Sequence, residues 1–172
     1  MFKPLDSILP VLETTPARWK TLCQTLPADL LSRRPGEDAW SALDCLNHLI
    51  DTEKNIFPVR VRAFLAGENF PAFNPDEEGA AIASPTPADL AAEFASLRVR
   101  SLKLLKSLGA DDFARTAQHP ELGQVTLEQL LHEWAGHDLN HTIQAEQALM
   151  QPFIVGCGPW RKYFADHDFA LK

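Results

Sequence analysis

The sequence lacks the long apolar and basic runs that mark several classes of protein. No uninterrupted apolar segment approaches the roughly 20 residues of a membrane-spanning helix, so no membrane partner is expected. Lysine- and arginine-rich runs are absent, and the net charge is −7. Because a nucleic-acid surface needs a clustered basic face, nucleic acid is not an expected partner either. The first residues show no basic region followed by an apolar stretch, so no signal peptide is predicted.

Cysteine is also scarce. The three cysteines, Cys23, Cys45 and Cys157, are widely spaced and include no Cys-x-x-Cys pair. An odd, scattered set of this kind does not make a disulfide framework and is typical of the reducing cytoplasm. We therefore predict a cytoplasmic protein whose cysteines are small buried apolar residues.

Alternating strand patterns and internal repeats are lacking as well, and amphipathic segments with helical spacing take their place. The 172 residues, 45% of them apolar, are enough for one domain over residues 1–172 with a proper core. Four such long segments predict an all-α fold, an antiparallel four-helix bundle. A long connection over residues 67–85 is expected between the second and third helices, and the residues after Met150 are expected to form a wrapped C-terminal tail.

Caps and prolines predict where these helices begin and end. Thr15-Pro16 predicts the start of the first long helix, after a shorter helical piece over residues 6–13. The second helix spans residues 42–66 with a kink at Pro58, and the third spans 87–108. Capping patterns mark the starts of the second helix, at Ser41 with Asp44, and of the fourth, at Thr126 with Gln129. The third helix opens at Thr86-Pro87, a cap residue followed by proline.

The most informative stretch of the sequence is the fourth helix. Steps of three and four residues from Leu127 through Leu130 and Trp134 reach His137 and His141, so two histidines lie in a buried seam. They lie about 40° apart around the helix axis and one turn apart along it, a spacing that lets two imidazoles bind one ion. The spacing leaves two interpretations open, a metal site or a pair of hydrogen-bonded core histidines.

A zinc-protease motif is excluded by the same geometry. His132-Glu133 resembles the start of His-Glu-x-x-His, but the next histidine, His137, follows His132 by five residues. The two side chains point about 140° apart and cannot share a metal from one regular helix. His132 is interpreted as a rim residue. Glu133, four before His137, is either a neighbour of the site or an exposed glutamate.

Other helices must supply any further ligand. His48 is the only histidine of the second helix, at the edge of its apolar arc, and periodicity alone does not make it a ligand. Glu53 lies among apolar positions of the same helix and needs a partner if it is buried. Arg98, in the seam of the third helix, is the predicted partner in a structural ion pair.

Short motifs in a fixed order resemble a known family. The matching residues are Trp40-Ser41, His48-Leu49, Asp51, Glu53, His119-Pro120, Gly123, Thr126-Leu127, His137-Asp138, His141 and Gln144. From about Arg18 to Ala148 the chain resembles the DinB-like (YfiT-like) metalloprotein superfamily. The resemblance implies a four-helix bundle that holds a divalent metal through His48, His137 and His141. It also implies a possible homodimer, an expectation that the apolar tail supports.

The activity that the resemblance implies is less defined. Some family members resemble thiol-dependent transferases that join small electrophiles to low-molecular-weight thiols, one is similar to a maleylpyruvate isomerase, and many are named metal-dependent hydrolases. We therefore expect a metal-dependent transferase or hydrolase with a small-molecule substrate. Zinc suits three imidazole ligands best, with nickel, iron or manganese as alternatives. The competing hypothesis is a non-catalytic bundle that binds a small ligand or partner, with its metal absent or structurally closed by Glu133, Cys45 or Asp51.

Overall fold

The computed structural model describes residues 4–70 and 85–171 of the chain. Its longer helices are α1 (Leu5–Thr25), α3 (Ala42–Asn55), α4 (Phe57–Ala66), α5 (Pro87–Leu105) and α6 (Leu127–Gly156). The shorter elements are the helix α2 (Ala28–Ser32), the 3-10 helices η1 (Ala110–Ala114), η2 (Gly158–His167) and η3 (Phe169–Leu171), and the strands β1 (Thr116–His119) and β2 (Gly123–Thr126).

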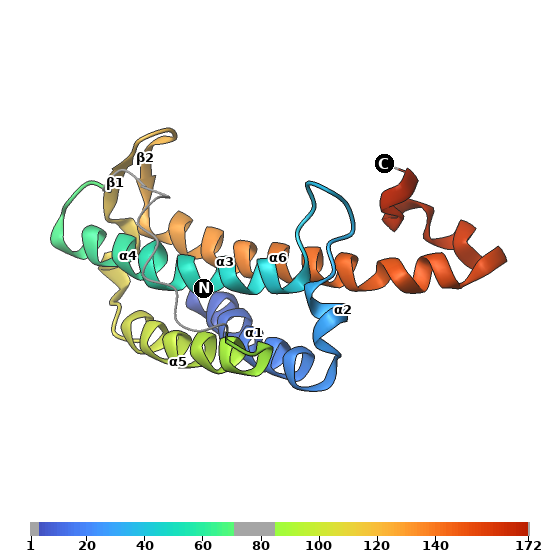
Figure 1. Ribbon diagram of the computed structural model, residues 1–172. Helices are drawn as coiled ribbons and strands as arrows, with labels where there is room; N and C mark the ends of the chain where they lie inside the picture. The colour runs from blue at the N-terminus through green and yellow to red at the C-terminus, as the bar shows by residue number, and fades with distance from the viewer. Residues whose placement is uncertain (1–3, 71–84, 172) are drawn as a thin grey trace.

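The long helices form the predicted four-helix bundle (Figure 1). α3 packs against α5 and α6, and α1 packs against the same two helices, so α1 and α3 occupy diagonal positions. α3, α4 and α5 run in one direction along the bundle, opposite to α1 and α6 (Figure 1). Two successive helices that point the same way need a long connection, which is the segment predicted over residues 67–85. Residues 71–84 of that segment lie outside the described residues.

The first helix is continuous, so the predicted break before Thr15 is wrong. α1 contains both Pro10 and Pro16 in its interior. Thr15 does not cap a helix; it is buried, and its hydroxyl donates a hydrogen bond to the Val11 carbonyl at 2.9 Å. One apolar face from Ile8 to Cys23 packs along the bundle, and this burial outweighs the hydrogen bonds lost at the two prolines.

The second predicted helix, by contrast, divides into two. Ile56, with φ −114° and ψ −75°, separates α3 from α4, and Pro58 lies in the first turn of α4. A proline in the first helical turn loses no helical hydrogen bond, whereas a proline in the interior does. The kink predicted at Pro58 is therefore an interruption: α3 ends before Ile56, and a separate helix, α4, begins after it. Phe57, the first residue of α4, is buried against α6.

The three predicted helix starts are confirmed as reciprocal capping boxes. In each box a side-chain oxygen accepts from a backbone N–H three residues on, and the side chain there accepts from the cap's own N–H. The pairs are Ser41 with Asp44, Thr86 with Asp89, and Thr126 with Gln129. α5 ends at Leu105, three residues before the predicted end.

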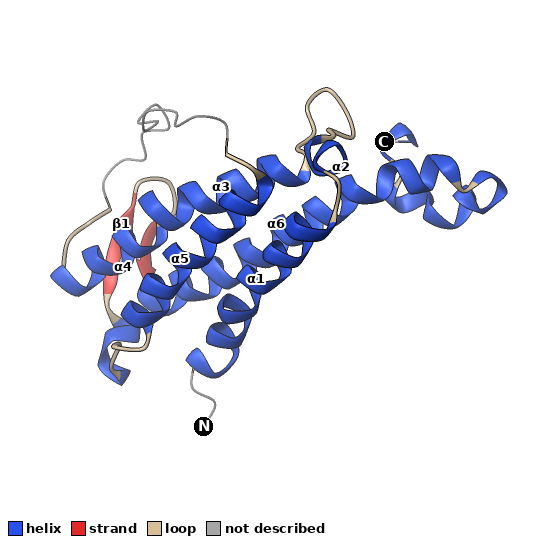
Figure 2. Cartoon of the chain, turned by 60° about the horizontal axis from the view of Figure 1, so that its bottom comes forward, coloured by secondary structure: helices blue, strands red, loops and turns tan. Residues whose placement is uncertain are grey.

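A small β-hairpin precedes α6, although no strands were predicted. β1 and β2 pair antiparallel, with Thr116 opposite Thr126 and His119 opposite Gly123 (Figure 2). Gly123 has a φ of 73°, a left-handed conformation that glycine adopts without steric cost. Strands of four residues contain too few alternations to be recognised by pattern. The hairpin leads directly into the cap of α6.

The chain after Met150 continues α6 to Gly156 and then folds back (Figure 2). Gln151 holds the tail, because its amide donates to the His167 carbonyl at 2.9 Å and accepts from the Phe169 N–H at 3.0 Å. The predicted wrapped tail thus packs on the projecting end of α6. Trp160 and Tyr163 are exposed on this extension. The homodimer stays a prediction.

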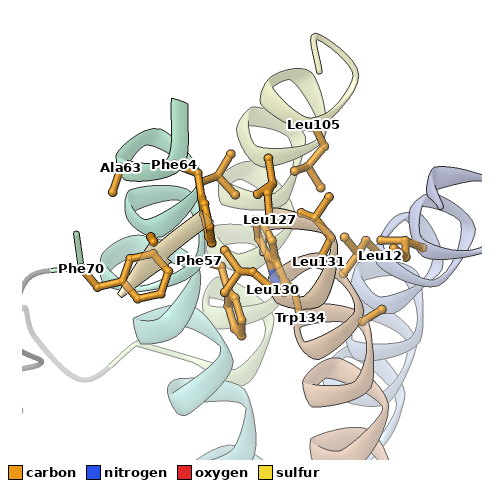
Figure 3. Close-up of a cluster of buried hydrophobic side chains, with 14 residues drawn as sticks. Leu12, Phe57, Ala63, Phe64, Phe70, Leu105, Leu127, Leu130, Leu131 and Trp134 are labelled. Carbon is orange, nitrogen blue, oxygen red and sulfur yellow. The ribbon is translucent and has the colours of Figure 1, made fainter. Parts of the chain in front are cut away.

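Two apolar clusters fill the bundle and leave a polar layer between them. One lies near α4 and contains Leu12, Phe57, Phe64 and Trp134 (Figure 3). The other includes Trp19, Leu46, Phe94, Ala145 and Leu149. On α6, residues 137–141 separate Trp134 of the first cluster from Ala145 of the second. The helices in the described parts of the chain lack the combined length and apolarity needed to cross a bilayer.

Candidate metal centre

Three histidines meet in the polar layer where α3 packs on α6. His48 projects from α3, and His137 and His141 project from successive turns of α6. One ligand nitrogen from each ring lies within 4.8 Å of the others, and no fourth His, Cys, Asp or Glu joins this group within the described residues. His48 Nε2 and His137 Nε2 are 3.0 Å apart. The structure therefore brings together all three residues named by the sequence; we call them the three-histidine cluster.

All three imidazoles favour the neutral form. Burial is the main cause, lowering the pKa of His137 from 6.5 to about 3 and lowering the pKa values of His48 and His141 as well. The rings also oppose one another's protonation, since the pKa of His137 is lowered further by His141 and His48. Neutral imidazoles have the free lone pair that a metal ion requires.

Gln144 fixes the tautomer of His141. His141 Nδ1 lies 2.9 Å from Gln144 Oε1, and because an amide oxygen only accepts, the ring proton belongs on Nδ1. His141 Nε2 then has the lone pair. Hydrogen bonds of this kind commonly orient metal-binding histidines. His137 differs, because its Nδ1 is buried with no hydrogen-bond partner among the described residues. Burying a nitrogen without a hydrogen bond costs free energy, so a histidine that only fills the core is a poor choice at this position. This cost favours a functional role for the His137 ring.

Aromatic rings border the three-histidine cluster on two sides. Trp40 stacks on His141, with centroids 5.5 Å apart and planes at 18°, and contacts His48 at 5.0 Å. On the other side, the edge of Phe57 meets His137 at 5.1 Å. Trp40 was part of the family resemblance but was not predicted as a site residue. The sequence signal that could have identified Trp40 was its position immediately before Ser41, the N-cap residue of α3.

The donor set fits a divalent cation. Zinc binds imidazole nitrogen at about 2.1 Å, so two tetrahedral ligands lie about 3.4 Å apart, close to the 3.0 Å between His48 and His137. Three neutral nitrogens suit zinc, nickel, iron or manganese rather than calcium or magnesium, which prefer oxygen. The cluster would leave coordination positions for water or substrate, as catalytic sites do.

The other residues considered as ligands lie elsewhere. His132 and Glu133 do not belong to the cluster, and both have exposed side chains. Glu133 is not the partner of His137 Nδ1. Partial burial raises the pKa of the Glu133 carboxyl, and the positive charge of Arg60 offsets only part of this rise. Cys45 is buried outside the cluster, and Asp51 accepts a hydrogen bond from Asn55 at 2.6 Å. His132 thus lies on the exposed side of α6, away from the three-histidine cluster.

A buried ion cluster lies beside the histidines. The predicted pair of Arg98 and Glu53 is confirmed, with N–O distances of 2.8 and 2.9 Å. Asp138 also binds Arg98, at 2.6 and 3.0 Å, which the sequence did not predict. The side chains of Arg98, Glu53 and Asp138 are each 1% exposed. We call this group the Arg98 cluster.

The neutral histidines predict how acid affects the metal-free protein. Between the lowered pKa of His137, about 3, and its usual 6.5, the unfolded chain binds a proton that the folded chain does not. Stability is therefore lost as the pH falls below about 6.5. Between pH 7 and pH 5 we expect His137 to account for a loss of about 1–2 kcal/mol. Urea unfolding of chelator-treated protein at both pH values measures this, and His137→Gln should reduce the loss. An equal loss in that variant would contradict the assignment.

Relatives of known name agree with a metal site. A family model described as the DinB superfamily matches residues 11–145. A protein of Halalkalibacterium halodurans, named "Putative metal-dependent hydrolase", is 25% identical over 152 residues, covering 87% of this chain and 88% of that one. A Bacillus cereus protein of the same name is 30% identical over 107 residues, covering 60% of this chain and 61% of the other.

Two solved structures share the fold. YfiT from Bacillus subtilis, described as a probable metal-dependent hydrolase with an unusual four-helix bundle topology, aligns with a TM-score of 0.68 at 22% identity over 83% of this chain and 84% of its own. A DinB-like protein, YjoA from Bacillus subtilis, aligns with a TM-score of 0.60 at 18% identity over 83% and 89% of the two chains. With the family model matching most of its length, this chain belongs to the DinB superfamily.

Proposed function

We propose that this protein is a metal-dependent enzyme acting on a small molecule, in which His48, His137 and His141 bind one divalent cation. The observation that supports this most is the convergence of three imidazole nitrogens within 4.8 Å. The names of the relatives in Halalkalibacterium halodurans and Bacillus cereus point the same way. Zinc is the proposed ion, since it suits three neutral imidazoles.

A divalent cation with three imidazole ligands supplies a Lewis acid, which lowers the pKa of a coordinated water or thiol and polarises a carbonyl. The chain's own residues prepare that position. Gln144 holds the proton of His141 on Nδ1, so Nε2 is free to bind. Trp40 and Phe57 border the cluster with apolar rings and limit the directions from which a substrate can approach.

Hydrolysis and thiol transfer are the two reactions compatible with this site. In hydrolysis the oxygen of a water molecule bonds to the carbonyl carbon of an ester or amide, the C–O or C–N bond breaks, and the alcohol or amine leaves with a proton from the water. In thiol transfer the thiolate sulfur of a low-molecular-weight cosubstrate bonds to a carbon of a small electrophile, and the leaving group on that carbon departs with its electron pair. The names of the relatives support hydrolysis. Support for thiol transfer comes from the sequence motifs alone. A non-catalytic bundle with a closed structural metal would need a fourth protein ligand, and none joins the cluster within the described residues.

Metal analysis of purified protein tests the site directly. We expect about one divalent ion per chain, loss of that ion on dialysis against a chelator, and recovery when zinc is added back. The ion should also protect the fold, because a ligand that binds only the folded state raises the unfolding temperature. Protein that is reproducibly metal-free and cannot be reloaded would exclude the proposed function.

Activity assays then separate the two reactions. Loaded protein is assayed for hydrolysis of activated esters and, separately, for consumption of small thiols in the presence of electrophiles. The chelated protein and His137→Ala, both lacking metal, serve as matched controls. Loss of activity in both controls assigns the reaction to the site. Loaded protein that is inactive in both assays would favour the binding-module alternative.

A further inference from the structure

Every N–H donor of Arg98 is hydrogen-bonded to a neighbour in the centre of the bundle. Its five N–H groups make five hydrogen bonds: two to Glu53, two to Asp138 and one to the Leu12 carbonyl at 3.1 Å. Its guanidinium carbon lies 4.9 Å from the centroid of the Phe94 ring and 5.6 Å from that of the Trp134 ring. Arg98 therefore has no donor left for any other group.

The charges in this cluster do not balance. All four carboxylate oxygens of Glu53 and Asp138 accept from Arg98, the arrangement expected of ionised acids. Two carboxylates share one guanidinium, so the cluster has a net charge of about −1. Arg98 and Asp138 are 1% and 0% exposed, so solvent hardly screens this charge. A buried charge without a counterion is costly.

The uncompensated charge lies next to the three-histidine cluster. Asp138 follows His137 directly and precedes His141 by one turn of α6, and Glu53 lies on α3 just over one turn after His48. Three neutral imidazoles bring no negative charge of their own to a cation.

We infer that Glu53 and Asp138 are positioning residues that act on the cation through the histidines. The net negative charge of the Arg98 cluster compensates the positive charge of a cation bound by the three-histidine cluster. The inference rests on the proposed function, because it requires the three-histidine cluster to bind metal. Neither carboxylate belongs to the three-histidine cluster, because both oxygens of each accept hydrogen bonds from Arg98. The competing explanation is that the Arg98 cluster only fastens α1, α3, α5 and α6 together.

Amide variants separate charge from packing. Glu53→Gln and Asp138→Asn each remove one negative charge with little change of shape, from two different helices. Asp168→Asn is the matched control, because Asp168 is also a buried carboxylate bound to an arginine, Arg161, but belongs to the tail. Zinc affinity is measured on each full-length protein by competition with a chromophoric chelator. The unfolding of each metal-free protein is measured in parallel.

We expect Glu53→Gln and Asp138→Asn each to weaken zinc binding by about 10- to 100-fold, and Asp168→Asn to leave it unchanged. Folded variants that bind zinc as tightly as the wild type would overturn the inference and leave the proposed function intact. Weakening in Asp138→Asn alone would also overturn it, since Glu53→Gln removes the same charge. Wild-type protein that binds no zinc would overturn both. If Asp138→Asn does not fold, Glu53→Gln decides by itself, because Glu53 lies on α3 and is not adjacent to a histidine of the cluster.

Discussion

Replacing either histidine of α6 is expected to abolish metal loading. The His137→Ala and His141→Ala proteins should contain close to no zinc after desalting, where the wild type contains about one ion per chain. Each variant leaves two imidazoles, and a cation held by two neutral ligands exchanges readily with solvent. The measurement is elemental analysis of protein loaded with zinc and desalted.

His132→Ala is the matched control for these variants. It removes an imidazole from the same helix, but from an exposed position outside the three-histidine cluster. Zinc content should stay at about one ion per chain. If His132→Ala were the damaging change and His137→Ala were harmless, the assignment of the helix face would be wrong. His48→Ala extends the test to α3, with the same expected loss as the α6 variants.

Replacing Arg98 is expected to have the largest effect on stability. Arg98→Met leaves Glu53 and Asp138 buried together without a counterion, and it removes five hydrogen bonds. Loss of one partner from a buried ion cluster typically costs about 3–5 kcal/mol. That is a large share of the roughly 5–15 kcal/mol by which most domains are stable. Urea unfolding of the metal-free protein measures the change.

Two comparisons make the result interpretable. Arg34→Met breaks the exposed pair of Arg34 with Asp44 and should change stability far less, since solvent screens that pair. The triple variant Arg98→Met, Glu53→Gln, Asp138→Asn removes all three charges and should be more stable than Arg98→Met alone. If Arg98→Met were as stable as the wild type, the cost assigned to the buried carboxylates would be wrong.

Local sequence determined two of the three histidines in the cluster. His137 and His141 are four residues apart, and a helix places such residues on one face whatever surrounds it. The same arithmetic excluded His132. The capping boxes at Ser41, Thr86 and Thr126 were equally predictable, because a cap depends on residues within one turn. These features are governed by the geometry of a single helix.

Long-range packing decided what those rules leave open. α1 continues through two prolines because its whole apolar face is buried, while α3 and α4 separate at Ile56. Glu53 and Arg98 could be paired from sequence, because each is a charged residue in an apolar seam. Asp138 could not, because nothing in α6 alone indicates that it faces Arg98.

By itself, then, the sequence determined a helical bundle, the beginnings of α3, α5 and α6, and one pair of convergent imidazoles. Motif resemblance added His48, which periodicity could not assign. Only the tertiary structure placed His48 Nε2 3.0 Å from His137 Nε2, stacked Trp40 on His141 and closed the Arg98 cluster behind them. The physical reason is that helix phase fixes directions within one helix, whereas contacts between helices depend on how the whole core packs.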